Sequence, residues 1–337
     1  MSLESLMQTY IPAVETELRQ VVAHAGGPNL EGLHHMLAYH MGWESEGAGP
    51  VTRGKRIRPL MILLCTAAAG GEWERALPAA AAVELVHNFS LIHDDIEDNS
   101  PLRHGRPTIW SLWGVAQATN AGDAMFTLAQ LALLRLEETA SPQVAIEASR
   151  LLQETCLQLT QGQYLDLSYE QRGDLTLEAY WPMVSGKTAA LLSASTGLGA
   201  LVAGAEAPAQ AAYRQFGRSL GLAFQAQDDL LGIWGDAALT GKSSESDLVS
   251  GKKSLPVLYG LSLGKSFAAR WNQGPVQAED VSSLAAQLEQ EGALSYTQEI
   301  AGRLTQEALD ALQTARPQGP AGEALHELAL FLLKRQG

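Results

Sequence analysis

The sequence predicts an all-α protein, a single large helical bundle formed by residues 1–337. Hydrophobic residues make up 46% of the chain and aromatic residues only 6%. Ala and Leu dominate and β-branched runs are scarce, which favours helices over sheets. Length alone would suggest two domains, but no Pro/Gly/Ser-rich linker separates two kinds of composition. We therefore expect one domain with a large buried core.

The expected helices follow one another along the chain. The first two are amphipathic, cover residues 3–24 and 30–42, and are separated at Gly26-Gly27-Pro28. An apolar helix from Leu60 to Ala69 follows a basic segment. The run from Ala80 to Leu91 predicts a helix that continues through the next acidic residues until Pro101 ends it. Further helices are expected at 111–135, 142–169, 176–200 and 208–233, and helices after residue 280 brace the bundle.

An acidic cluster ends the helix that begins near Ala80, within the sequence LIHDDIEDNSPLRHGRPTIW of residues 91–110. Asp94 and Asp98 are four residues apart, so their carboxylates project from one helix face, with Asp95 beside them. These like charges repel one another unless a cation lies between them. Mg²⁺ takes one or two carboxylates together with substrate phosphates, which predicts a metal site here.

A second acidic pair, Asp228 and Asp229, lies in FQAQDDLLGIWGD, residues 224–236. A single pair of this kind is often no more than a solvated helix face. Two pairs embedded in apolar helical sequence, each followed by basic residues, indicate a functional site.

The net charge of −14 argues against nucleic-acid binding, which needs a basic surface patch. The positive charge is instead concentrated near the candidate motifs. Local field, not net charge, decides whether an anionic substrate binds. The basic residues within the motifs are Lys55, Arg56, Arg58, Arg103, Arg106, Lys187, Lys242, Lys252 and Lys253.

LIHDDIED followed by LRHGRP resembles the first aspartate-rich motif of the trans-prenyl diphosphate synthases, and FQAQDDLLG resembles the second. The resemblance extends over roughly residues 55–256, with several motifs in the family's order. The chain looks most like a geranylgeranyl diphosphate synthase and next most like a farnesyl diphosphate synthase. The resemblance implies the isoprenoid synthase type of bundle, with a central apolar cavity for the growing chain.

The implied reaction joins isopentenyl diphosphate head-to-tail to an allylic diphosphate. In the family, Mg²⁺ (three ions per site) stabilises the departing diphosphate, and the matching metal ligands are Asp94, Asp98 and Asp228. The resemblance implies these catalytic residues: Asp94, Asp95, Asp98, Arg103, Lys187, Asp228, Asp229 and Lys242.

Substrate-binding residues are implied by the same matches. Lys55, Arg58 and His87 correspond to residues that bind isopentenyl diphosphate, and Arg103 and His104 follow the first acidic motif. Lys242 and Lys252 match loop lysines that close over a diphosphate. Lys187 and Thr188 match a pair that contacts the allylic diphosphate, Gln163 and Asp166 match residues that face the site, and Gln225 is a further substrate-binding match.

Product length is expected to depend on Phe89, five residues before Asp94 and so about 7.5 Å away along the helix axis. In the family, an aromatic residue there closes the cavity early and goes with short products. Small Ser90 lies beside it, and Met125 and Phe126 are candidates for the cavity floor. The alternative is that Phe89 is an ordinary core residue.

Two positions depart from the family pattern. His104 stands where a second arginine is usual, with Arg106 as a possible substitute, and Gly232 stands where many members have a third aspartate. A terpene cyclase would share the fold but not need Lys55, Arg58 and His87. A non-catalytic regulatory subunit should have lost acidic residues that this chain keeps.

Other expectations concern the protein's surroundings. Cys65 and Cys156 lie in apolar helical sequence without metal-ligand spacing, which predicts buried, reduced thiols. The chain shows no signal peptide and no strong membrane span, so we expect a cytoplasmic protein without stable membrane insertion. The resemblance implies a homodimer.

Overall fold

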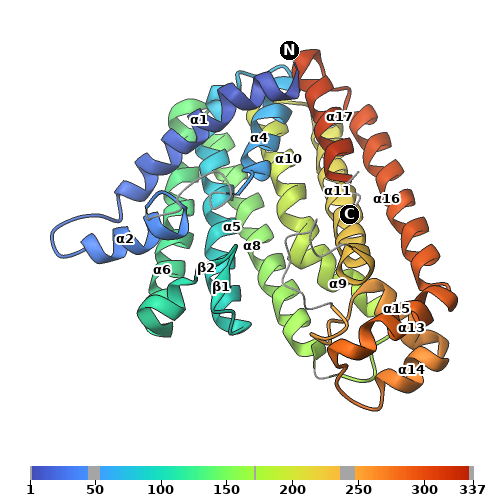
Figure 1. The fold of residues 1–337 in the computed structure, drawn as a ribbon. Coiled ribbons are helices and arrows are strands. Elements are labelled where there is room, and N and C mark those ends of the chain that lie inside the picture. Colours follow the sequence, from blue (N-terminus) through green and yellow to red (C-terminus); the bar gives the residue numbers. More distant parts are fainter. Residues whose placement is uncertain (1, 45–53, 171, 236–246, 334–337) are drawn as a thin grey trace. The chain divides into compact units, whose positions relative to one another are not determined.

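The computed structural model describes residues 2–44, 54–170, 172–235 and 247–333, and most of them are helical (Figure 1). The predicted all-α fold is confirmed. Within these ranges, the strands are β1 (Leu102–Arg103) and β2 (Arg106–Pro107), which form one short antiparallel hairpin that the sequence analysis did not predict.

The chain forms two compact units, each made of several segments. Unit 1 contains Met1–Glu154, Ala194–Ala211 and Arg316–Leu325. Unit 2 contains Thr155–Ser193, Ala212–Ala315 and His326–Gly337. Several long helices carry the chain from one unit into the other. That the whole chain acts as a single domain stays a prediction.

In unit 1, helix α5 packs against α6, α4 and α1, and α5 and α6 lie side by side (Figure 1). Pro78 lies in the first turn of α5, where a missing N–H is harmless. Small residues 79–82 are fully buried and allow the neighbouring helices to approach closely. The elements of this part are α1 (Leu3–Ala23), α2 (Glu31–His40), α4 (Ile57–Ala68), η1 (Trp73–Ala76), α5 (Leu77–Glu97), α6 (Ile109–Leu134) and α7 (Leu136–Thr139).

Unit 2 has its own core, in which Leu248, Val257, Phe267 and Leu288 are buried together. The elements from α8 onward are α8 (Pro142–Glu170), η2 (Leu177–Ala179), α9 (Tyr180–Val184), η3 (Ser185–Ala189), α10 (Ala190–Val202), α11 (Ala207–Trp234), α13 (Leu255–Leu263), α14 (Ser266–Trp271), η4 (Ala278–Asp280), α15 (Val281–Gln290), α16 (Ala293–Ala315) and α17 (Gly319–Leu333).

Most predicted helices are confirmed to within a few residues at each end. The exception is the continuous helix expected at 176–200, which is wrong. That stretch is divided into η2, α9, a π-helical turn at Ser185–Ala189 and α10. Helix α5 also ends at Glu97, before the Pro101 that was expected to stop it.

Cys65 and Cys156 are free and buried, as predicted, and burial raises the pKa of Cys156 to about 11. Across the described ranges, every helix is too short or too polar to cross a bilayer.

Candidate functional site

The three acids of the first acidic motif differ in their surroundings. Asp94 is half-buried in the last turn of α5, and exposed Asp98 caps the helix, its N–H donating to the Asp94 carbonyl at 2.8 Å. Asp95 is buried, and its Oδ1 accepts a hydrogen bond from Arg103 Nε at 2.8 Å. Burial raises the pKa of Asp95, although Arg103 opposes this. Asp94 and Asp98 are therefore more exposed than Asp95, which holds Arg103.

The β1–β2 hairpin delivers the basic residues that follow this motif. Its two turn residues, His104 and Gly105, have φ values of 52° and 76°, as a two-residue type I′ turn requires. The turn directs Arg103 to Asp95 and leaves His104 exposed. Arg106 stacks on the ring of Tyr39 at 4.2 Å and donates to the Tyr39 carbonyl. Arg106 is thus engaged with α2.

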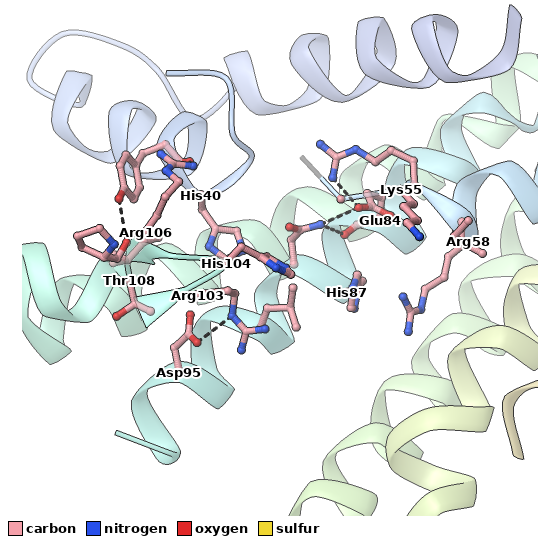
Figure 2. A pocket seen from close by; sticks show the side chains of 18 residues that line it. His40, Lys55, Arg58, Glu84, His87, Asp95, Arg103, His104, Arg106 and Thr108 are labelled. Carbon is pink, nitrogen blue, oxygen red and sulfur yellow. Dashed lines mark hydrogen bonds and ion pairs between the residues drawn. The ribbon is translucent and has the colours of Figure 1, made fainter. Parts of the chain in front are cut away.

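A cavity of about 150 Å³ opens beside the hairpin, within unit 1 (Figure 2). We call it the cationic cavity. Its walls come from the end of α2, the segment before α4, the middle of α5 and the hairpin. The predicted residues that line it are Lys55, Arg58, His87, Asp95, Arg103, His104 and Arg106. Residues far apart in the sequence are thus brought together, among them Lys55, Arg58 and His87, which were expected to bind the same substrate.

Arg58 has a buried Nε atom that makes no hydrogen bond to any described residue. Burial lowers the pKa of Arg58, although Glu84 opposes this. His87 is also affected: burial and then Arg58 and Arg103 hold its pKa well below the usual value. A buried guanidinium without a full set of acceptors is costly unless an anion completes it. This cavity therefore has the character of an anion-binding site.

Arg56 points elsewhere, although it lies between two predicted ligands. It has φ 47° at the N-cap of α4. Its Nε donates to Glu15 at 2.7 Å and its Nη1 to Glu84 at 2.7 Å. Asn88 also donates to Glu84, at 3.0 Å. This buried network fixes the backbone that presents Lys55 and Arg58. The feature of the sequence that indicates this network is Glu84, a single acidic residue within an apolar run.

In the second acidic motif, Asp229 is 1% exposed and accepts three hydrogen bonds. The donors are Tyr180 Oη at 2.9 Å, Gln225 Nε2 at 2.9 Å and the backbone N–H of Leu255 at 2.8 Å, in the first turn of α13. Burial raises the pKa of Asp229. Asp228, half-buried, faces a different direction on α11. As in the first motif, one acid is structural and its neighbour is more accessible.

Lys252 lies between Asp229 Oδ1 and Asp247 Oδ2, at 3.8 Å from each. Burial alone would lower the pKa of Lys252, but the two carboxylates outweigh it and the pKa is raised. Asp247 occupies the space next to Gly232, where an added Cβ would lie 2.1 Å from Asp247 Oδ2. Its backbone N–H donates to the Gly232 carbonyl at 3.1 Å. Asp247, absent from the predicted site, brings a third carboxylate to this motif.

Lys187 projects from the π-helical turn between α9 and α10, and its Nζ pairs with Asp166 of α8. A Cβ on Gly162 would lie 2.2 Å from the Lys187 backbone nitrogen, so α8 and the turn touch backbone to backbone. Thr188 Oγ1 donates to Gln225 at 2.8 Å. The predicted neighbours of the allylic substrate are therefore assembled in unit 2.

Phe89 belongs to an aromatic cluster between α5 and α6. Its ring meets that of Phe126 edge-on, with centroids 5.0 Å apart, and that of His93 at 5.8 Å. Gly122 makes room for His93, whose Nε2 lies 2.2 Å from where a Cβ at 122 would be. Ser90 Oγ donates to the His87 carbonyl at 2.8 Å. Contacts between these aromatic rings therefore join α5 to α6.

Carboxylates that could hold a metal are found in both acidic motifs. Lys242 falls in the stretch 236–246 and lies outside the described residues. Among the described residues, His, Cys, Asp and Glu side chains form no group of three or more that could hold a metal without other ligands. Mg²⁺ needs only one or two carboxylates when phosphate oxygens complete its shell. Asp94 and Asp98, one helical turn apart, fit that requirement.

The chain is similar to prenyl diphosphate synthases of known sequence. It is 42% identical over 313 residues to a (2E,6E)-farnesyl diphosphate synthase of Mycobacterium tuberculosis, covering 89% of this chain and 86% of that protein. It is equally 42% identical, over 294 residues, to a geranylgeranyl diphosphate synthase of the same species, covering 85% and 83%.

A crystal structure of a polyprenyl synthetase from Streptomyces coelicolor A3(2) superposes with a TM-score of 0.87 at 34% identity, over 98% of this chain and all of that one. The sequence pattern described as Polyprenyl synthetase matches residues 49–288. Together with the two acidic motifs and the cationic cavity, these matches identify the chain as a member of the polyprenyl synthetase family.

Proposed function

We propose that the protein is a Mg²⁺-dependent prenyltransferase that condenses isopentenyl diphosphate with an allylic diphosphate and makes geranylgeranyl diphosphate. The observation that supports this most strongly is the cationic cavity, where Arg58 lacks a hydrogen-bond acceptor for its buried Nε among the described residues. A terpene cyclase needs no such second anion site. The farnesyl and geranylgeranyl synthases among the relatives are enzymes of this reaction class.

In this proposal the diphosphate of isopentenyl diphosphate binds Lys55, Arg58 and His87 in the cationic cavity. Arg103, held by Asp95, completes the cavity next to the first acidic motif. Binding there orients the alkene so that its attack on the allylic carbon becomes effectively unimolecular. The lysine, the two arginines and the histidine bind the anion and take no covalent part.

The allylic diphosphate is served by Asp94, Asp98 and Asp228, the proposed Mg²⁺ ligands. Bound Mg²⁺ would supply electrostatic stabilisation of the leaving diphosphate. Lys187 and Lys252, with Lys242, add positive charge as that diphosphate departs. The chain needs no nucleophile, because the alkene attacks and the departing diphosphate is the expected proton acceptor. Each acidic motif then acts through its more accessible aspartates.

The product length rests on the aromatic cluster of Phe89, Phe126 and His93, proposed as the floor that stops the chain at twenty carbons. Farnesyl diphosphate, with fifteen carbons, is the second candidate, because the similar Mycobacterium tuberculosis proteins include one named for each product. The homodimer and the cytoplasmic location are proposed by analogy with the family.

The test is an assay with Mg²⁺, isopentenyl diphosphate and each allylic primer in turn, with chain length read by chromatography. A twenty-carbon diphosphate supports the proposal, and fifteen carbons supports the second candidate. A hydrocarbon or alcohol from the primer alone would indicate a cyclase. No product with any primer would indicate a regulatory subunit and refute the proposed activity.

A further inference from the structure

His40, the last residue of α2, lines the cationic cavity but belongs to no motif of the sequence (Figure 2). Helix α2 is fixed beside the hairpin by two contacts of the preceding residue. Tyr39 Oη donates to the Pro107 carbonyl at 2.8 Å, and the Tyr39 ring stacks under Arg106. The position of His40 is therefore set by packing that does not involve its own ring.

Asn88 lies next to the His40 ring and is itself held by Glu84. Asn88 Nδ2 donates both to the Glu84 carbonyl, at 2.8 Å, and to Glu84 Oε1, at 3.0 Å. These two bonds use both hydrogens of the Asn88 amide, so its oxygen is the group that can interact with a hydrogen on the His40 ring, and this interaction acts to raise the pKa of His40. A neutral ring carries one hydrogen, which leaves its other nitrogen for the cavity that His40 lines.

The cavity that His40 lines carries more positive than negative side chains. Burial first, and then Arg103, Arg56 and Arg106, lower the pKa of His40 to about 3, although Asn88 opposes this. The ring is neutral in the empty cavity, so its second nitrogen has a lone pair and no hydrogen. A lone pair repels an anion, whereas a protonated nitrogen donates a charge-assisted hydrogen bond. The titratable and charged groups that line the cavity with His40 are Lys55, Arg56, Arg58, Glu84, His87, Asp95, Arg103, His104 and Arg106.

We propose that His40 is a further ligand of the diphosphate of isopentenyl diphosphate and takes up a proton when that diphosphate binds. This rests on the proposed function of the cationic cavity. An incoming diphosphate brings two to three negative charges into a space of about 150 Å³, which favours the imidazolium form. Asn88 and Glu84 act as positioning residues that keep the ring turned toward the anion.

The experiment titrates isopentenyl diphosphate into the full chain by calorimetry without Mg²⁺, so that the acidic motifs attract no diphosphate. Repeating it at pH 7 in buffers of different ionisation enthalpy gives the protons taken up. His40→Gln keeps a hydrogen-bond donor but cannot be charged. It should bind roughly tenfold more weakly and take up about one proton fewer than the unchanged protein. The KM of the allylic substrate should change by less than about twofold.

His35→Gln is the matched control, because His35 lies on the same helix with its side chain 54% exposed and paired with Glu44. It should leave both affinity and proton uptake unchanged. Should His40→Gln fold poorly, the ring signals of labelled His40 in the unchanged protein give the same answer, since they should move to imidazolium values on binding.

The two proposals fail separately. A chain that makes no prenyl diphosphate refutes the proposed function. A chain that makes the product, while His40→Gln binds isopentenyl diphosphate with unaltered affinity and proton count, refutes only the role of His40. Ring signals that stay neutral at saturation would do the same.

Discussion

The Asp247 carboxylate occupies the space that a side chain at Gly232 would fill, with Oδ2 2.1 Å from the ideal Cβ position. Asp247 can therefore occupy this position because Gly232 has no side chain. It holds Lys252 at 3.8 Å from both Asp247 and Asp229. The departure from the family's second motif is accompanied by a carboxylate from the following loop.

Gly232→Ala tests this arrangement. The methyl group displaces Asp247, so Lys252 loses one of its two partners and kcat should fall roughly tenfold. Stability should change little, because Ala gains up to about 1 kcal/mol of helix propensity. Gly302→Ala, in open space on α16, is the control and should leave kcat unaltered. Equal kcat values for the two variants would count against the arrangement.

Asp94 and Asp95 are adjacent, but their substitution should change different kinetic parameters. Asp95→Asn weakens the hold on Arg103, so the KM of isopentenyl diphosphate should rise about tenfold, with no change in the Mg²⁺ requirement. Asp94→Asn should raise the Mg²⁺ concentration needed for half-maximal rate and lower kcat. Steady-state kinetics with varied Mg²⁺ separate the two. The same response in both variants would show that the acids share one role.

Phe89→Ala should lengthen the product, because it removes one ring of the cluster with Phe126 and His93. The loss of packing should also cost about 2 to 4 kcal/mol of unfolding free energy, read by denaturant titration. Phe331, 53% exposed, offers a control in which Phe→Ala changes neither quantity greatly. An unaltered product distribution for Phe89→Ala would mean that Phe89 is only a core residue.

Gly162→Ala should destabilise the protein by about 1 to 3 kcal/mol, since its Cβ would lie 2.2 Å from the Lys187 backbone nitrogen. The displaced π-helical turn carries Lys187, so activity should fall as well. Thermal unfolding gives the measurement. Gly32→Ala, helical with no neighbouring atom within 4 Å, should be neutral or slightly stabilising. A neutral Gly162→Ala would contradict the close crossing.

Stability should fall as the pH drops from 7 to 5, partly because of His40. Its folded pKa of about 3 lies below the value of 6.5 in the unfolded chain. Below pH 6.5 the unfolded chain therefore binds more protons, and the free energy of unfolding decreases by about 2 kcal/mol by pH 5. His40→Gln should lose that much less over the same range. Parallel pH profiles for the variant and the unchanged protein would contradict the neutral state of His40.

The sequence predicted what local pattern controls. Helix α5 follows from its apolar run, and the four-residue spacing correctly placed Asp94 and Asp98 one turn apart. It could not separate Asp95 from them, because the partner that buries Asp95 comes from a hairpin eight residues later. The family resemblance did single out Arg58 and not Arg56, but the reason is structural, since Arg56 has a left-handed backbone and pairs with distant Glu15.

Other features were missed because they arise from contacts between distant segments. The π-helical turn at 185–189 lies directly against Gly162 of α8. A single glycine in the sequence does not indicate which distant segment packs against it. His40 belongs to no motif of regularly spaced residues, so nothing in the amphipathic pattern of α2 distinguishes it from His34 or His35. Lys242 and its loop keep the status of a sequence prediction.

The left-handed backbone conformation of His104 determines which other residues can be placed at this position without strain. An arginine introduced to imitate the common family motif would have to adopt φ near 52°, at a penalty of about 1 to 2 kcal/mol for a long side chain without local hydrogen bonds. Glycine and asparagine adopt that region readily. A randomised library at this codon, selected for folding alone, should be enriched in Gly, Asn, Asp and His before any choice is made for turnover.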